Sequence, residues 1–123
     1  MNLYDDVIDV RDIIERIEEL EELIEGEGCE EACNEYREEL TLLSNIMEEM
    51  KGYGGDEQWR GDWYPSTLIR ESYFTDYAEE LVRDCYQLTG LPDFVHIDWQ
   101  ATARDVQVDY TPIDVDGATY FYR

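Results

Sequence analysis

Two series of apolar residues, spaced alternately three and four residues apart, dominate the N-terminal part of the chain. Such spacing places every member on one side of a helix with about 3.6 residues per turn. The first series consists of Val10, Ile13, Ile17, Leu20 and Ile24. The second series consists of Cys33, Tyr36, Leu40, Leu43, Met47 and Met50. Gly26 and Gly28 separate the two series, so the pattern predicts two helices packed as an antiparallel hairpin.

The pattern changes after Met50. Residues 51–65 are rich in glycine and large aromatic side chains and are predicted to form a loop. Residues 66–71 favour a short strand, and a helix is predicted from Ser72, as its N-terminal cap, to Gly90. A second short helix follows over residues 98–106, with Asp98 as its cap. The last residues alternate around Asp116-Gly117, which is typical of a β-hairpin.

These elements predict an α+β fold. An acidic antiparallel helical hairpin at the N-terminus (1–51) is followed by a connection rich in glycine and tryptophan (52–65). A small α+β domain that ends in a β-hairpin then occupies residues 66–123. A chain of 123 residues is long enough to bury roughly two-thirds of its unfolded surface in one domain.

The charge is strongly one-sided. The chain has 32 acidic and 9 basic residues, giving a net charge of −23, and Lys51 is its single lysine. This charge repels nucleic acids and anionic membranes and favours a basic partner. No apolar run approaches the roughly 18 residues of a membrane span, and the acidic N-terminus does not resemble a signal peptide. We therefore expect a cytoplasmic protein.

The acids are placed away from the apolar positions. The helix expected over residues 5–25 carries ten acids and two bases along about 31 Å, or one net charge per roughly 4 Å. One DNA strand has a phosphate every ~3.4 Å. The hairpin is therefore predicted to present to a basic cleft a row of negative charges spaced much like the phosphates of a nucleic-acid backbone. The predicted partner-binding residues are Glu15, Glu18, Glu19, Glu21, Glu22, Glu25, Glu30, Glu31, Glu35, Glu38 and Glu39, with Trp59 and Trp63 as aromatic anchors or as a lid over the core.

Two plainer interpretations remain beside this one. Any exposed helix carries a charged outer face, although such a face usually mixes signs through pairs four residues apart. Adaptation to high salt also enriches acids and depletes lysine. Against it, glutamate outnumbers aspartate 18 to 14 and large apolar residues are abundant.

No motif predicts catalysis or metal binding. Cys29, Cys33, Cys85 and His96 would provide the four ligands of a zinc site, but they do not recur at ligand spacing and cysteine is commonly a small buried residue. The run from Asp114 to Gly117 lacks the downstream glutamate of a calcium loop. Nucleophile-elbow, phosphate-loop and zinc-protease motifs are missing from the sequence. We therefore expect a protein without enzymatic activity, cofactor or metal.

The C-terminal half resembles a known family. The runs LIRESYFTDYAEELVRD and FVHIDWQATARDVQVDY, with the terminal hairpin ending FYR, look like the C-terminal domain of the ArdA antirestriction proteins of phages and conjugative elements. The resemblance covers about residues 66–123 and is carried by Tyr73, Phe74, Tyr77, Ala78, Ile97, Asp98, Trp99, Ala101, Ala103, Arg104 and Asp105. This chain is shorter than that family, has the helical hairpin in place of its other two domains, and lacks its acidic-aromatic motif.

The resemblance implies an acidic DNA mimic that occupies the DNA-binding groove of a type I restriction-modification enzyme in the bacterial host cytoplasm. ArdA proteins are dimers, so the resemblance leaves a homodimer open. An alternative is an anti-CRISPR protein, since CRISPR effector complexes also hold nucleic acid in a basic channel. A second alternative is a non-inhibitory acidic interaction domain or a salt-adapted structural protein.

Overall fold

A computed structural model describes residues 2–26 and 30–123, with the side chains of residues 30–33 outside the described part. The fold is α+β, as the sequence predicts, and ends in a β-hairpin. In chain order the elements are β1 (Val7–Asp9), α1 (Val10–Gly26), α2 (Glu30–Met50), β2 (Glu57–Trp59), β3 (Asp62–Tyr64), β4 (Thr67–Arg70), the 3-10 helix η1 (Glu71–Tyr73), α3 (Phe74–Cys85), α4 (Trp99–Gln107), β5 (Thr111–Val115) and β6 (Ala118–Tyr122).

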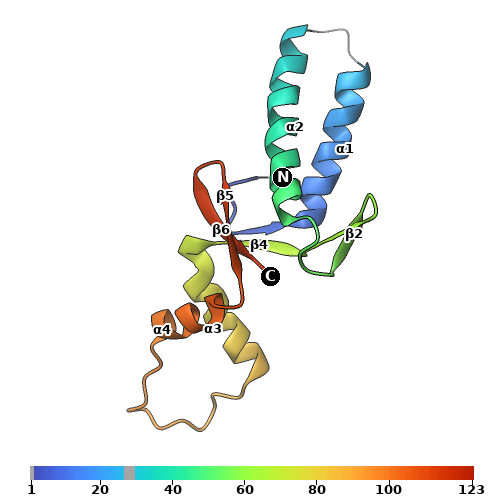
Figure 1. Ribbon diagram of the computed structural model, residues 1–123. Helices are drawn as coiled ribbons and strands as arrows, with labels where there is room; N and C mark the ends of the chain where they lie inside the picture. The colour runs from blue at the N-terminus through green and yellow to red at the C-terminus, as the bar shows by residue number, and fades with distance from the viewer. Residues whose placement is uncertain (1, 27–29) are drawn as a thin grey trace.

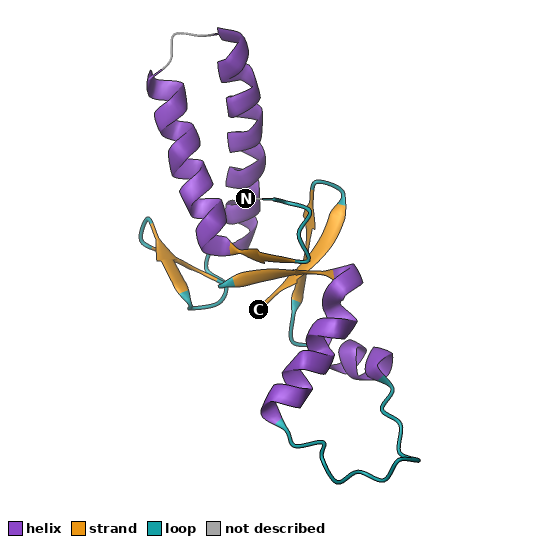
Figure 2. Ribbon diagram, turned by 180° about the vertical axis from the view of Figure 1, so that it is seen from behind, coloured by secondary structure: helices purple, strands orange, loops and turns teal. Residues whose placement is uncertain are grey.

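The molecule is elongated and has three layers. The hairpin of α1 and α2 projects from one face of a four-stranded sheet, while α3 and α4 lie on the other side (Figure 1). The sheet has the order β1-β4-β6-β5, and all its pairs are antiparallel. A separate two-stranded hairpin, β2 and β3, lies beside the base of the helical hairpin (Figure 2).

The predicted helical hairpin is confirmed, and its apolar series forms the buried seam. Each fully buried leucine or isoleucine side chain contributes about 1.5–3 kcal/mol relative to an exposed one. Ile24, Tyr36 and Leu40 are only half-buried, and the side chain of Cys33 lies outside the described part. The seam residues with exposed fractions of 1% or less are Val10, Ile13, Ile17, Leu20, Leu43, Met47 and Met50.

Helix α1 begins later than the sequence predicts. Residues 7–9 instead form β1, in which Ile8 lies opposite Leu68 of β4. The backbone N–H of Val10 then donates to the carbonyl of Ser66 at 2.9 Å. The predicted helix start at Asp5 is therefore wrong, because pairing with a strand far along the chain satisfies the backbone of these residues better than a helical turn.

The alternation of side chains along the sheet separates two groups of core residues. Leu68, Tyr120 and Tyr122 belong to the core shared with the helical hairpin, whereas Ile69 and Phe121 contact the α3–α4 layer. Successive residues of a strand face opposite sides, so each central strand contributes to both groups. The hairpin of α1 and α2 thus shares one core with the four-stranded sheet, and the sheet itself includes β1, which precedes that hairpin in the chain. The composition change at residues 52–65 does not mark separate cores.

The connection contains a hairpin where the sequence predicts only a loop. Trp59 of β2 lies opposite Asp62 of β3, and Arg60 and Gly61 form the two-residue turn between them. Both turn residues have positive φ, 50° and 83°, as a turn that matches the twist of a hairpin requires. The loop prediction is wrong here because arginine is not one of the residues that usually mark the first position of such a turn.

The third helix is shorter than predicted. Ser72 lies in η1, and α3 starts after Tyr73, which makes no side-chain capping hydrogen bond, so the prediction of Ser72 as a cap is wrong. The helix ends at Cys85, and Tyr86 is already extended. Residues 83–87 are all exposed, so this end of α3 lacks the buried apolar side chains that anchor the rest of the helix.

Two local predictions of turn chemistry are confirmed. Asp98 caps α4, where its Oδ1 accepts from the backbone N–H of Ala101 at 3.1 Å. Asp116 and Gly117 form the turn between β5 and β6, with φ values of 51° and 90°. The carboxylate of Asp114 accepts from the N–H of Gly117 at 2.8 Å and holds that turn.

Candidate protein-interaction surface

The six predicted glutamates of α1 lie together on one side of the molecule. They line a shallow, open depression along the helix, formed by Glu15, Glu18, Glu19, Glu21, Glu22 and Glu25. Helical geometry turns each residue by about 100°, so Glu22 and Glu15 point almost directly away from the buried seam of Ile13, Ile17 and Leu20. We call Glu15, Glu18, Glu22 and Glu25, which are all exposed, the α1 acidic face.

Glu39 and Glu19 are used within the hairpin. Arg16 donates from Nε and Nη2 to the two carboxylate oxygens of Glu39, at 2.9 and 2.8 Å, and from Nη1 to Glu19 at 2.6 Å. This bidentate bond joins α1 to α2 and lowers the pKa of Glu39 against the opposing effect of burial. Glu39 is therefore a brace between the helices, whereas the sequence places it on the partner-binding surface.

The β2–β3 hairpin supports the other flank of α1. The indole Nε1 of Trp59 donates to the carboxylate of Glu18 at 3.2 Å. The guanidinium of Arg60 lies 4.2 Å from the centre of the Trp59 ring and forms an ion pair with Glu21. Glu21 thus has a basic partner in its own chain, while Glu18 accepts a hydrogen bond from a neutral indole and forms none of the ion pairs among the described residues.

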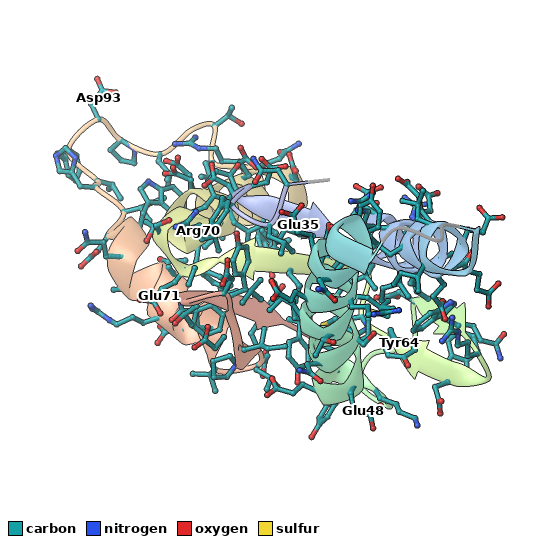
Figure 3. The ribbon with its side chains drawn as sticks, turned by 90° about the horizontal axis from the view of Figure 1, so that it is seen from above. Glu35, Glu48, Tyr64, Arg70, Glu71 and Asp93 are labelled. Atoms are coloured by element: carbon teal, nitrogen blue, oxygen red, sulfur yellow. The ribbon has the colours of Figure 1, made fainter. Side chains whose placement is uncertain are left out.

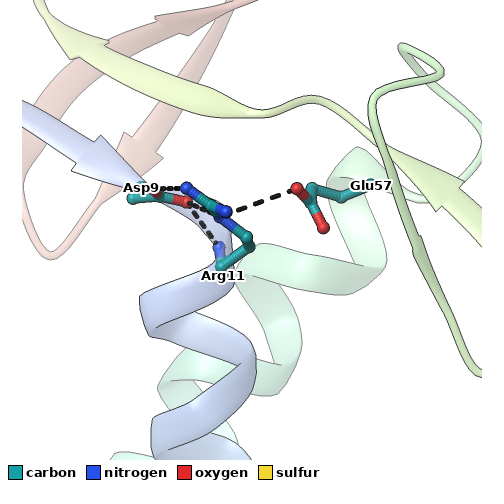
Figure 4. A network of polar contacts seen from close by, with 3 residues as sticks. All are labelled: Asp9, Arg11 and Glu57. Atoms are coloured by element: carbon teal, nitrogen blue, oxygen red, sulfur yellow. Dashed lines mark hydrogen bonds and ion pairs between the residues drawn. The ribbon is translucent and has the colours of Figure 1, made fainter.

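An arginine fixes this hairpin to the start of α1. Figure 4 shows Arg11 between Asp9 and Glu57, with 2.9 Å from Nη2 to Asp9 and 3.6 Å from Nε to Glu57. The hydrogen bond from Arg11 lowers the pKa of Asp9, although partial burial of the carboxylate opposes this. The contact ties β1, α1 and β2 together below the α1 acidic face.

The two predicted tryptophan anchors face opposite sides of the β2–β3 hairpin. Trp59 is half-buried and packs against the core, with its ring centre 6.0 Å from that of Tyr64. Trp63 lies opposite Gln58 in the register, on the other face, and is 47% exposed. The lid interpretation therefore applies to Trp59 and Tyr64, and Trp63 alone is available as an anchor.

The outer side of α2 is less acidic than the sequence suggests. Glu35 and Glu38 are exposed, but Asn34, Arg37 and Thr41 are exposed among them. Figure 3, which looks down onto the hairpin, shows Glu48 on the outer side of the base of α2. The side chains of the remaining predicted residues, Glu30 and Glu31, lie outside the described part.

The charge density of α1 is also lower than predicted. The helix has 17 residues, or about 26 Å, and carries seven acids and two bases. This corresponds to one net charge per roughly 5 Å, because the first three aspartates of the chain precede the helix. The spacing is wider than that of phosphates along one DNA strand, ~3.4 Å, but the charges lie on one side of the helix.

A second exposed feature was not identified from the sequence. The segment between α3 and α4, residues 86–98, bows away from the sheet with Asp93 at its outer end (Figure 3). Four of its large apolar side chains are exposed, including Phe94 at 82% and Tyr86 at 68%. In the sequence, residues 94–97 form only a brief, mainly apolar run, and such a run does not by itself indicate exposure.

The described residues do not contain a group of three or more histidine, cysteine or acidic side chains that would hold a metal ion. Cys85 is exposed, and Cys29 and Cys33 lie outside the described side chains. Within the same part of the chain, the helices are all too short or too polar to cross a membrane.

The chain was compared with protein-family models, curated proteins and solved structures. No protein-family model matches the chain, and no significant match was found among curated proteins or solved structures.

Proposed function

We propose that this protein is an acidic DNA mimic that blocks the DNA-binding cleft of a bacterial restriction-modification enzyme in the host cytoplasm. The observation that supports this most is the α1 acidic face, four exposed glutamates on one side of a helix braced from both flanks. The likeness of residues 66–123 to the ArdA C-terminal domain supports the choice of target. An anti-CRISPR activity is the alternative, because it requires the same surface.

The bracing is what separates this surface from an ordinary solvated helix. Arg16 of α1 forms ion pairs with Glu19 and Glu39, and Arg60 of the β2–β3 turn forms one with Glu21. None of the ion pairs among the described residues involves Glu15, Glu18, Glu22 or Glu25. Those charges stay available to a basic cleft, and the Glu18 side chain, which Trp59 holds, loses less conformational entropy on binding than a free one.

The test is competition with duplex DNA. Purified protein is titrated against a type I restriction enzyme and, separately, a CRISPR effector, each bound to labelled DNA. We expect displacement that weakens steeply as salt rises, since ionic contacts of this kind are screened. The proposal would be contradicted if the protein displaced DNA from none of the enzymes tested.

Matched variants locate the surface. Changing the four residues of the α1 acidic face to Gln is expected to abolish inhibition, whereas single changes weaken it only slightly, because many weak contacts add up. The control changes four exposed acids at the other end of the molecule, Asp76, Asp84, Asp105 and Asp109, to Asn and removes the same charge. Equal losses in both quadruple variants would show that net charge, and not this face, is responsible.

A further inference from the structure

A polar pocket lies on the side of the sheet away from the α1 acidic face. Its volume is about 440 Å³, within the ~300–1,000 Å³ range of small-molecule sites. The start of β4 contributes Ser66 and Thr67, α3 contributes Tyr77, the turn before β5 contributes Tyr110, and Arg123 follows β6. The C-terminal end of the described chain, marked C in Figure 1, therefore reaches this pocket.

The two tyrosines leave one hydroxyl proton unused. The Oη atoms of Tyr77 and Tyr110 are 2.8 Å apart, so one hydroxyl donates to the other. Each phenol has a single proton, and the accepting hydroxyl keeps its own. Among the described residues, neither hydroxyl makes another side-chain hydrogen bond. The half-buried pair therefore offers one O–H donor to an acceptor in the pocket.

Three further side chains of the wall, Ser66, Thr67 and Arg123, are also donors. The hydroxyls of Ser66 and Thr67 make no hydrogen bond to the side chains that the structure describes, and each can donate. Arg123 forms none of the ion pairs found among the described residues, although acids outnumber bases 32 to 9. Burial raises the pKa of Tyr77 above its ordinary value, and the positive charge of Arg123 opposes that rise. Arg123 therefore interacts electrostatically with the tyrosine hydroxyl.

The backbone around the pocket is closely fitted. Gly54 has a φ of +73°, and a Cβ added there would lie 2.8 Å from the Cα of Pro65 and 3.2 Å from the carbonyl oxygen of Arg123. The one acid of the lining, Asp56, is exposed on this connection. The pocket is thus rich in donors in a protein whose surface is otherwise rich in acceptors.

We infer that this pocket binds a small organic anion through a carboxylate or phosphate group. Arg123 supplies the positive charge, and the hydroxyls of Ser66, Thr67 and the tyrosine pair donate to the remaining oxygens. The exposed guanidinium makes the ion pair, and the tyrosine rings provide apolar contact for the organic part. This inference does not depend on the proposed function, since the pocket is separate from the α1 acidic face.

The test is a titration followed by NMR with phenyl phosphate and, separately, benzoate as probes. We expect saturable shifts of resonances from Thr67, Tyr77 and Tyr110 with at least one of them, and none with the neutral analogue benzyl alcohol. Saturation by one probe only identifies which oxyanion the pocket takes. The absence of saturation with both anions, or equal binding of benzyl alcohol, would overturn the inference.

Two arginine variants test the role of the charge. Arg123→Gln is expected to weaken binding at least tenfold, whereas Arg104→Gln, an exposed arginine on α4, is expected to leave it unchanged. Unchanged spectra away from the pocket establish that both variants are folded. If both substitutions weakened binding equally, the affinity for the anion would depend on surface charge in general. That result would refute the proposal that the pocket binds it.

Discussion

Arg16 shows at the scale of a single residue how this acidic chain remains folded. It is one of few bases, and its bidentate bond to Glu39 joins two helices that would otherwise repel each other. We predict that Glu39→Gln lowers the free energy of unfolding by about 1 kcal/mol at neutral pH, a modest amount because both side chains are partly exposed. Chemical denaturation measures this difference.

The pH dependence of the same variant tests the cause. The folded-state pKa of Glu39 is lowered, so the stabilisation is present above its unfolded pKa and is lost as the pH falls through the folded value. Wild type and Glu39→Gln should therefore become equally stable at low pH. Glu38→Gln is the control, since Glu38 is exposed and outside the bond. A difference that persists after Glu39 is protonated would count against the ion pair.

At the scale of the element, the hairpin depends on its seam and not on its charged faces. Ile17 is 1% exposed, so Ile17→Ala is expected to lower the free energy of unfolding by about 2–5 kcal/mol. Glu22→Gln, five residues later on the opposite side of α1, should change it by less than about 0.5 kcal/mol. Thermal or denaturant unfolding compares the two. Similar losses would mean that the faces of α1 are wrongly assigned.

At the scale of the whole molecule, the net charge of −23 sets opposite salt dependences for folding and binding. Raising NaCl from ~0.1 M to ~1 M shortens the Debye length from about 10 Å to about 3 Å. Self-repulsion then weakens, so the melting temperature should rise, while inhibition of a DNA-binding enzyme should fall. Calorimetry and the competition assay follow the two trends. A protein that folds only in molar salt would instead support the salt-adapted interpretation.

The elements whose pattern is local could be predicted from the order of residues alone. The α1 and α2 seams, the Asp98 cap and the Asp116-Gly117 turn depend on residues within a few positions of each other, and the structure confirms them. The outward placement of the α1 glutamates follows from the same helical period. The conformation of each of these features is set by residues that are close together in the sequence.

The remaining features depend on contacts between residues far apart in the chain, so they could not be predicted from local patterns. Strand β1 exists because β4 pairs with it, and this pairing shortens α1 and lowers its charge density. The bonds from Arg16 to Glu39 and from Arg60 to Glu21 decide which glutamates have a basic partner within the chain, and no local pattern predicts these two pairs. The pocket at Arg123 likewise arises from segments brought together by folding. Its chemistry depends on one phenol proton whose partner lies 33 residues away.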